Sequence, residues 1–182
     1  MDTREAVDLI AAAIPRRAGT WADIGAGEGT FTRALAQLLG PEGRIYAVDR
    51  DGRAVAALER WAVQEGVRVI PLTADFTQPL DLPGLEAGEL DGMLLANTLH
   101  FVADAAAVLA RLVARVRPGG SIVVVEYDGR SASRWVPYPI PPARLPVLAA
   151  AASLTPFTVT GTKASAFGGT IYVAVATRAG SG

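Results

Sequence analysis

Three glycines at alternate positions, Gly25, Gly27 and Gly29, follow a short apolar run and precede residues with helical spacing. A turn built from glycines lets backbone N–H groups approach a ligand closely, and the N-terminus of the helix beyond it favours anionic or polar groups. A carboxylate, Asp49, stands at the end of the next apolar run, where nucleotide-binding folds hold ribose hydroxyls. This spacing predicts a binding site for a nucleotide-like cofactor.

Polar residues also follow the ends of the other predicted strands, namely Asp75, Asn97, His100 and Glu126. In open sheets of parallel strands, ligands bind beyond the carboxyl ends of the strands, at the point where the strand order reverses. We therefore expect these side chains to converge with Asp49 on one cleft.

Strand-like and helix-like segments alternate along the chain. The predicted strands cover 20–24, 44–48, 67–72, 90–96 and 121–126, and the predicted helices cover 2–14, 30–39, 51–65, 105–116 and 143–153. Two further strand-like runs, 157–164 and 170–177, are joined by a short glycine-containing segment and predict an antiparallel hairpin. The segment 77–89 is expected to form a short helix or a loop, and the proline-rich segment 127–142 an irregular loop.

This alternation predicts an α/β fold in a single domain over residues 1–182. The expected sheet is doubly wound, mostly parallel and seven-stranded, with an antiparallel C-terminal hairpin strand and helices on both faces. The N-terminal helix falls within 1–15, and the tail 180–182 is expected to be disordered.

The composition excludes several kinds of chemistry. The 182 residues include no cysteine, which removes disulfides, thiolate metal sites and cysteine nucleophiles. The formal net charge is −1 and no basic block is present, which disfavours a nucleic-acid partner. The apolar runs are too short to cross a membrane, and the charged N-terminal segment is unlike a signal peptide. We expect a cytoplasmic protein without a membrane partner.

In its motifs and their order, the sequence resembles the class I (seven-stranded, Rossmann-like) S-adenosylmethionine-dependent methyltransferases. The acidic residue followed by Gly-x-Gly-x-Gly in that family matches residues 23–29. The family's acids after the second and third strands match Asp49 and Asp75, and its Arg/Lys-Pro-Gly-Gly turn before the fifth strand matches 117–120. The resemblance runs from the first strand to the terminal hairpin, and it implies a methyltransferase with S-adenosylmethionine as its cofactor.

The resemblance also implies roles for single residues. Asp49 would bind the ribose hydroxyls through charge-assisted hydrogen bonds, although an acid at this position can also cap the next helix. Asp75 would accept a hydrogen bond from the adenine amino group, although it could equally close a turn. The other implied cofactor-binding residues are Arg50 and Phe76 at the adenine ring, Asp23, Gly25, Gly27 and Gly29 at the methionine portion, and Asn97 at the ammonium group.

His100 is the only histidine, and it follows the fourth predicted strand. There it would face the methyl acceptor, where an imidazole can act as a general base near neutral pH. The alternative is that His100 caps the following helix or packs at the edge of the sheet. The candidates for contact with the acceptor are Glu126, Tyr127, Trp135 and Tyr138; the last two could equally pack the proline-rich loop.

Departures from known branches of the family narrow the range of acceptors. Asn97 is followed by Thr-Leu-His and not by Pro-Pro-Tyr, the motif of amino-methylating nucleic-acid enzymes. The lack of cysteine excludes the cysteine-nucleophile mechanism at pyrimidine C5, and the sequence has no metal-ligand pattern. These features favour a small-molecule acceptor at an open site, which a second subunit would complete if the protein is a homo-oligomer. Three alternatives stay open: a nicotinamide-dependent oxidoreductase, a non-catalytic binding module with the same fold, and another group transfer from the same cofactor, such as aminopropyl transfer.

Overall fold

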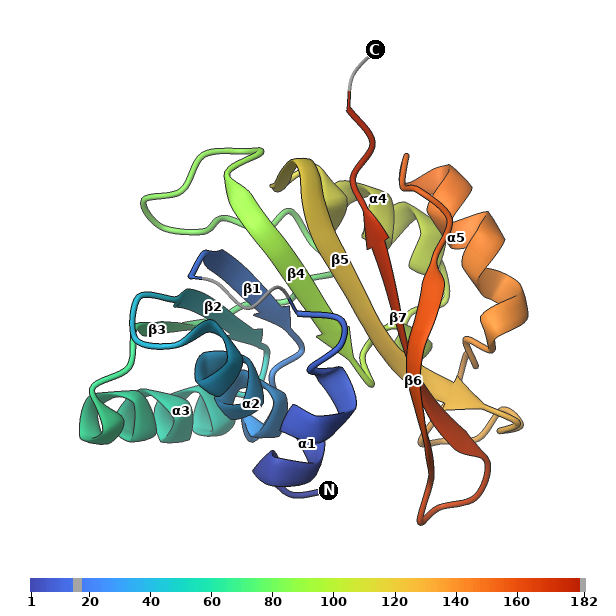
Figure 1. Ribbon diagram of the computed structural model, residues 1–182, viewed down its shortest axis with the longest axis horizontal. Helices are drawn as coiled ribbons and strands as arrows, with labels where there is room; N and C mark the ends of the chain where they lie inside the picture. The colour runs from blue at the N-terminus through green and yellow to red at the C-terminus, as the bar shows by residue number, and fades with distance from the viewer. Residues whose placement is uncertain (15–17, 181–182) are drawn as a thin grey trace.

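The computed structural model describes residues 1–14 and 18–180, which form a seven-stranded sheet with helices on both faces (Figure 1). The strands are β1 (Thr20–Ile24), β2 (Arg44–Asp49), β3 (Val69–Thr73), β4 (Leu90–Ala96), β5 (Val116–Asp128), β6 (Thr158–Ala164) and β7 (Thr170–Thr177). The α-helices are α1 (Thr3–Ile10), α2 (Thr30–Leu39), α3 (Gly52–Glu65), α4 (Ala105–Val113) and α5 (Leu145–Ala151). Two short 3₁₀ helices, η1 (Leu99–Phe101) and η2 (Pro142–Arg144), follow β4 and precede α5.

The strand order is β3-β2-β1-β4-β5-β7-β6. Strands β1 to β5 pair in parallel, β7 runs antiparallel to β5, and β6 runs antiparallel to β7. This arrangement confirms the predicted fold class. Because the chain proceeds from β1 to one side of the sheet and returns to β4 on the other side, the order reverses between β1 and β4. A ligand cleft is therefore expected at the carboxyl ends of these two strands.

Apolar side chains of each central strand alternate between two buried clusters, one on each face of the sheet. In β5, Ile122 and Val124 belong to the cluster that includes residues of α4 and α5. Val123 and Val125 belong to the cluster that includes residues of α1, α2 and α3. Because helices cover both faces, the strand reads as a continuous apolar run in the sequence.

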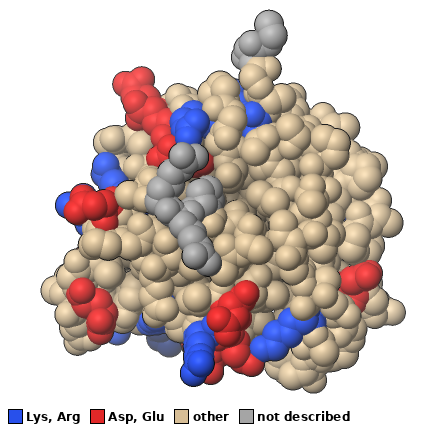
Figure 2. Space-filling view, in the orientation of Figure 1, with Lys and Arg blue, Asp and Glu red and all other residues tan. Residues whose placement is uncertain are grey.

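Charged side chains are scattered over the surface and are not separated by sign. On the face shown in Figure 2, most basic side chains lie singly or beside acidic ones. Ion pairs such as Arg117–Asp91 (2.8 Å) and Arg68–Glu42 (3.2 Å) occur among the exposed and half-exposed side chains. This distribution agrees with the near-zero net charge of the sequence.

Several element boundaries differ from the prediction. α1 ends at Ile10 and not at residue 14, α4 ends at Val113, and β3 begins at Val69. The predicted helix 143–153 is a 3₁₀ turn followed by α5, because Pro146 cannot donate a backbone hydrogen bond and is placed in the first turn of the helix. The segment 77–89 contains turns and no helix. Residue 15 of the predicted N-terminal helix and residues 181–182 of the predicted tail lie outside the described residues.

β5 begins at Val116, earlier than predicted, and contains the Arg-Pro-Gly-Gly segment 117–120. Arg117 donates from Nε to Asp91 Oδ1 (2.8 Å), and Asp91 Oδ2 accepts from the Thr20 N–H (2.8 Å). A register shift between β4 and β5 accommodates this segment. Through Asp91, the motif therefore connects the amino end of β5 to the amino ends of β4 and β1, at the edge of the sheet opposite the carboxyl ends where a ligand is expected.

Gly92 of β4 lies against the buried indole of Trp21 in β1. A Cβ atom at residue 92 would lie 2.5 Å from two ring carbons of Trp21, which is itself 2% exposed. We expect Gly92→Ala to lower the free energy of unfolding by about 1–3 kcal/mol, because the indole cannot move without disturbing the core. Urea denaturation measures this loss, with Gly180→Ala as a control in open space. Equal midpoints for the two variants would contradict this packing.

Candidate active site

Two cavities meet at the carboxyl ends of β1 and β4, the place that the strand order predicts. The first, the β2-side cavity, measures about 270 Å³ and is lined by residues after β2, β3 and β4, including Asp49, Asp75 and Phe76. The second, the hairpin-side cavity, measures about 360 Å³ and is lined by α1, the β1–α2 turn, β5 and the β6–β7 hairpin. Gly25 and Asn97 line both cavities, so the two adjoin at these residues.

The glycine-rich turn packs closely on β2 and β4. The N–H groups of Gly25 and Ala26 both donate to the Val48 carbonyl (2.8 and 3.0 Å). Gly25 has φ +74°, and a Cβ atom there would lie 2.5 Å from the Thr98 hydroxyl, so a side chain does not fit. The Gly27 N–H donates to Asp49 Oδ2 (2.8 Å), which links the turn to the end of β2.

Gly29 has a different environment from the other two glycines. It is the N-cap residue of α2 with φ +84°, and a Cβ atom there would lie 2.2 Å from Leu58 Cδ2. Gly29 is not among the residues that line either cavity. The third position of the motif is therefore a glycine because α2 begins there in close contact with α3.

Two carboxylates, Asp49 and Asp75, line the β2-side cavity together with Arg50 and Phe76. Asp49 accepts hydrogen bonds from the Gly27 and Asp51 N–H groups, both at 2.8 Å. Each carboxylate oxygen has further acceptor capacity, so Asp49 can also receive hydroxyl groups from a ligand.

Asp75 closes a turn and lines the β2-side cavity at the same time. Its Oδ1 accepts from the hydroxyl and the N–H of Thr77 (2.7 and 2.9 Å). These two hydrogen bonds lower the pKa of Asp75, which keeps the carboxylate ionised. The two roles that the sequence left open for Asp75 are therefore compatible.

Two buried oxygen atoms, Asp23 Oδ1 and Asn97 Oδ1, have no hydrogen-bond partner among the described residues. Both side chains line the hairpin-side cavity, and Asn97 has φ +54° and donates its N–H to the Val125 carbonyl (2.8 Å). Buried acceptors without donors cost free energy, so a ligand that supplies donors fits here. The ammonium group of a methionine portion is such a donor, and these residues fit the expected cofactor.

The Asp23 carboxylate is buried (1% exposed) and receives one hydrogen bond, from the Thr32 hydroxyl to Oδ2 (2.6 Å). Burial raises the pKa of Asp23 to about 7; the Thr32 hydrogen bond opposes this rise and the nearby charge of Asp49 adds to it. The folded state holds this proton more tightly than the unfolded state does. The protonated Asp23 side chain therefore contributes fully to the free energy of unfolding below pH 4, and this contribution is lost as pH rises through 7.

We therefore expect the free energy of unfolding of the ligand-free protein to fall by roughly 3–4 kcal/mol between pH 4 and pH 8 through this group. Asp23→Asn should remove this component, which urea denaturation at a series of pH values measures. If the pH profiles of the two proteins ran parallel, Asp23 would not be the group responsible.

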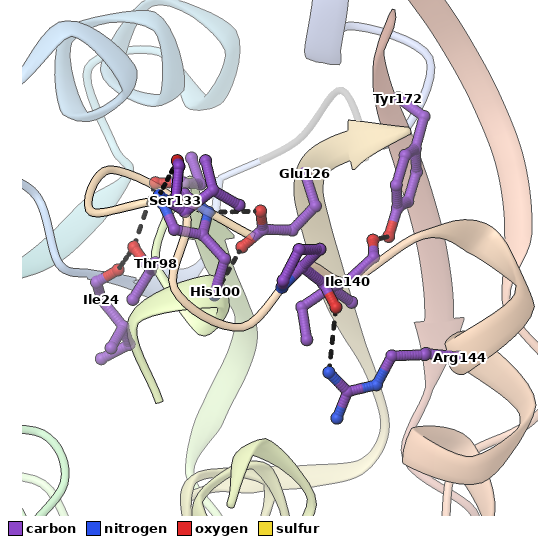
Figure 3. Close-up of polar contacts among 11 residues, drawn as sticks. Ile24, Thr98, His100, Glu126, Ser133, Ile140, Arg144 and Tyr172 are labelled. Atoms are coloured by element: carbon purple, nitrogen blue, oxygen red, sulfur yellow. Dashed lines mark hydrogen bonds and ion pairs between the residues drawn. The ribbon is translucent and has the colours of Figure 1, made fainter. Parts of the chain in front are cut away.

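His100 and Glu126 form a buried pair between η1 and β5 (Figure 3). His100 Nδ1 lies 2.6 Å from Glu126 Oε2, and the His100 N–H donates to Glu126 Oε1 (3.2 Å). The side chains are 3% and 0% exposed. The carboxylate thus fixes both the backbone and the ring of the histidine, and a proton on Nδ1 leaves Nε2 as the acceptor nitrogen.

The loop 129–142 covers this pair. The Tyr138 N–H donates to the His100 carbonyl (2.9 Å), and the Tyr172 hydroxyl donates to the Ile140 carbonyl (2.6 Å) (Figure 3). The His100 ring has two aromatic neighbours, with centroids 4.3 Å away for Phe101 and 5.9 Å away for Tyr127. Phe101 lines the β2-side cavity and Tyr127 the hairpin-side cavity, but His100 itself is 2% exposed and lines neither, so the expectation that it faces the cleft directly is not met.

Of the residues predicted to contact the acceptor, the structure places Tyr127 in the wall of the hairpin-side cavity. Glu126 points to the other face of β5, where its carboxylate bonds to His100. Trp135 and Tyr138 are 65% and 43% exposed and line neither cavity.

Several lining residues were missed in the sequence. They are Thr98, Phe101 and Val102 after β4, Met1 and Glu5 in or beside α1, and 163–167 in the hairpin. Lys163 bonds to Glu5 although the two are 158 positions apart, and this pair connects α1 to the hairpin above the cavity. The sequence predicted a hairpin, but no local pattern indicated that it would line the same cavity as the glycine turn, which lies more than 130 positions earlier in the chain.

Within residues 1–14 and 18–180, no cluster of three His, Asp or Glu side chains is arranged to hold a metal ion. The same part of the chain contains no helix that is long and apolar enough to span a membrane.

A family model described as "Methyltransferase domain" matches residues 22–120, the segment that carries the glycine turn, Asp49, Asp75 and His100. The chain belongs to this methyltransferase family. Together with the seven-stranded fold, the match confirms the prediction of a class I methyltransferase with S-adenosylmethionine as its cofactor. The alternative of a nicotinamide-dependent oxidoreductase has no support in this match.

Curated relatives match parts of this methyltransferase domain. The ribosomal RNA small subunit methyltransferase H of Acidobacterium capsulatum is 38% identical over 86 residues, which cover 43% of this chain and 28% of that protein. The protein of the same name from Verminephrobacter eiseniae is 48% identical over 56 residues, which cover 30% of this chain and 17% of that protein. The chain therefore spans less than a third of the length of these relatives.

Solved methyltransferase structures match nearly the whole chain in fold. The CurJ carbon methyltransferase superposes with a TM-score of 0.75 at 20% identity, covering 94% of this chain and 51% of that one. The Burkholderia thailandensis 1,6-didemethyltoxoflavin-N1-methyltransferase, with 1,6-didemethyltoxoflavin and S-adenosylhomocysteine bound, gives a TM-score of 0.74 at 23% identity, covering 98% of this chain and 78% of that one. At these identities the likeness concerns the fold alone.

Proposed function

We propose that this domain transfers the methyl group of S-adenosylmethionine to a nucleophilic O, N, S or C atom of a small-molecule acceptor by in-line displacement. The observation that carries the proposal is the hairpin-side cavity. Its volume of about 360 Å³ and its walls from α1, β5 and the hairpin suit a small molecule beside the cofactor's methionine portion. The matched ribosomal RNA methyltransferases suggest RNA instead, but the near-zero net charge of this chain favours the small molecule.

The residues that would hold the cofactor follow from the two cavities. In the β2-side cavity, Asp49 would bind the ribose hydroxyls, and Asp75, Phe76 and Arg50 would surround the adenine ring. In the hairpin-side cavity, Asp23 and Asn97 would bind the ammonium group. The backbone of Gly25 and Gly27 would lie beside this group, and Gly29 would support the glycine turn from the start of α2. When bound, the cofactor supplies an activated methyl group on a sulfonium, so the protein mainly aligns the acceptor and excludes water.

His100 is the candidate general base of this reaction. Glu126 holds Nδ1, so that Nε2 is the nitrogen that would accept a proton from the acceptor as the methyl group is transferred. Glu126 acts through His100 and is a positioning residue. Tyr127 would contact the acceptor directly, because it lines the hairpin-side cavity; its ring centroid lies 5.9 Å from that of His100.

Radiolabelled methyl transfer tests the proposal. The protein is incubated with methyl-labelled S-adenosylmethionine and either the small-molecule fraction or the RNA fraction of a cell extract. We expect label in the small-molecule fraction, with equimolar release of S-adenosylhomocysteine. Label in RNA alone would contradict the acceptor class. If the protein binds the cofactor and labels neither fraction, the non-catalytic binding module would be the better description.

A further inference from the structure

Arg130 follows β5 and stacks on an aromatic residue of the hairpin-side cavity. Its guanidinium carbon lies 4.8 Å from the ring centroid of Tyr127, which lines that cavity. Arg130 is half-buried, and among the described residues it forms no ion pair. A half-buried guanidinium without a carboxylate is a binding group for an anion.

The stem of Arg130 rests against the hairpin that forms the opposite wall. A Cβ atom at Gly169 would lie 3.3 Å from Arg130 Cγ, and residues 165–167 of the same hairpin line the cavity. The end of β5 pairs with the start of β7, so Arg130 lies beside the hairpin; it does not itself line the cavity but stacks on Tyr127, which does. The lysine in the wall, Lys163, is already bonded to Glu5, which leaves Arg130 to receive an external anion.

Charges around this cavity are separated by position. Its acidic lining residues come from α1, β1 and the β1–α2 turn: Glu5, Asp23 and Glu28. Arg130 follows the end of β5 and lies beside Gly169 of the hairpin. The ammonium group of the proposed cofactor would lie near β1, beside the acidic residues. An anionic group on the acceptor would then complement Arg130 after β5.

We propose that Arg130 recognises a carboxylate or phosphate group on the methyl acceptor. This inference rests on the proposed function for the identity of the hairpin-side cavity as the acceptor site. Stacking on Tyr127 orients the guanidinium, so that its donor edge can form two parallel hydrogen bonds with the anion. An acceptor bound in this way would place its anionic group at Arg130 and its remaining atoms along Tyr127 in the hairpin-side cavity.

Anion binding is tested on protein saturated with S-adenosylhomocysteine, by calorimetric titration of benzoate, phenyl phosphate and the neutral isostere benzamide. We expect the two anions to bind at least roughly tenfold more tightly than benzamide, and Arg130→Gln to abolish the difference. Arg134→Gln is the matched control, because Arg134 in the same loop stacks on Trp135 (4.7 Å), which lines neither cavity, whereas Arg130 stacks on Tyr127 of the cavity wall. Equal or absent binding of anions and benzamide to the unmodified protein would overturn the proposal.

A second titration distinguishes the acceptor from the carboxylate of the cofactor itself. S-adenosylhomocysteine carries that carboxylate and 5′-methylthioadenosine lacks it. We expect Arg130→Gln to leave the affinity for both unchanged. A selective loss of S-adenosylhomocysteine affinity would assign Arg130 to the cofactor and refute its role at the acceptor. Because these titrations need no turnover, they decide the role of Arg130 even if methyl transfer is not observed.

Discussion

His100→Asn is expected to slow methyl transfer by roughly 10²- to 10⁴-fold and to leave the affinity for S-adenosylhomocysteine unchanged. The asparagine amide can replace Nδ1 as the donor to Glu126 Oε2, but it has no nitrogen that accepts a proton as Nε2 does. The loss should therefore appear in kcat and not in cofactor binding. Single-turnover transfer rates and calorimetric titration measure the two effects separately.

The buried position of the pair requires a control for folding. His100→Ala would remove the imidazole from Glu126 Oε2 and leave the buried carboxylate with only the backbone N–H of residue 100, which costs up to roughly 3–5 kcal/mol of stability. The asparagine variant avoids this cost, and its unfolding midpoint should stay close to that of the parent protein. An asparagine variant with normal turnover would assign His100 to structure alone, as a group that fixes η1 beneath the loop 129–142.

Asp49→Ala is expected to weaken the binding of S-adenosylhomocysteine by at least about 100-fold. Two hydrogen bonds from ribose hydroxyls to an ionised carboxylate are worth about 1.5–3 kcal/mol each, and 1.4 kcal/mol corresponds to tenfold in affinity. The same substitution also releases the Gly27 N–H from Asp49 Oδ2, which loosens the glycine turn. Calorimetric titration measures the loss.

Asp51→Ala is the matched control for Asp49→Ala. Asp51 lies two positions away, caps α3 by accepting from the Arg53 N–H (2.9 Å), and lines neither cavity. A 2′,3′-dideoxy analogue of S-adenosylhomocysteine completes a double-mutant cycle, because the alanine variant should lose little further affinity for it. If the variant lost affinity for both ligands equally, Asp49 would act through the turn and not through the ribose.

The fold was predictable because local signals agreed along the chain. The glycines that end α2 and α3 (Gly40 and Gly66), the apolar run 121–126 and the terminal hairpin each indicate an element, and their order leaves few topologies. The positions of Asp49 and Asp75 at the carboxyl ends of β2 and β3 follow from this order alone, as their places in one cavity confirm.

Other features of the site depend on contacts between distant segments, which local patterns do not encode. The face of β5 on which Glu126 lies is set by the strand's register, and its bond to His100 depends on the turn of η1 after β4. The contact between Lys163 and Glu5 requires α1 and β6 to meet. The third glycine of the motif, Gly29, serves helix packing, which its spacing alone does not distinguish from ligand contact.

A crystal structure of the complex with S-adenosylhomocysteine tests the central claim most directly, namely that the two cavities form one cofactor and acceptor site. We predict the adenine beside Asp75 and Phe76, the ribose hydroxyls on Asp49, the ammonium group on the free oxygens of Asp23 and Asn97, and the sulfur facing Tyr127. A complex with the methionine portion outside the hairpin-side cavity, or with the sulfur turned away from Tyr127, would contradict it.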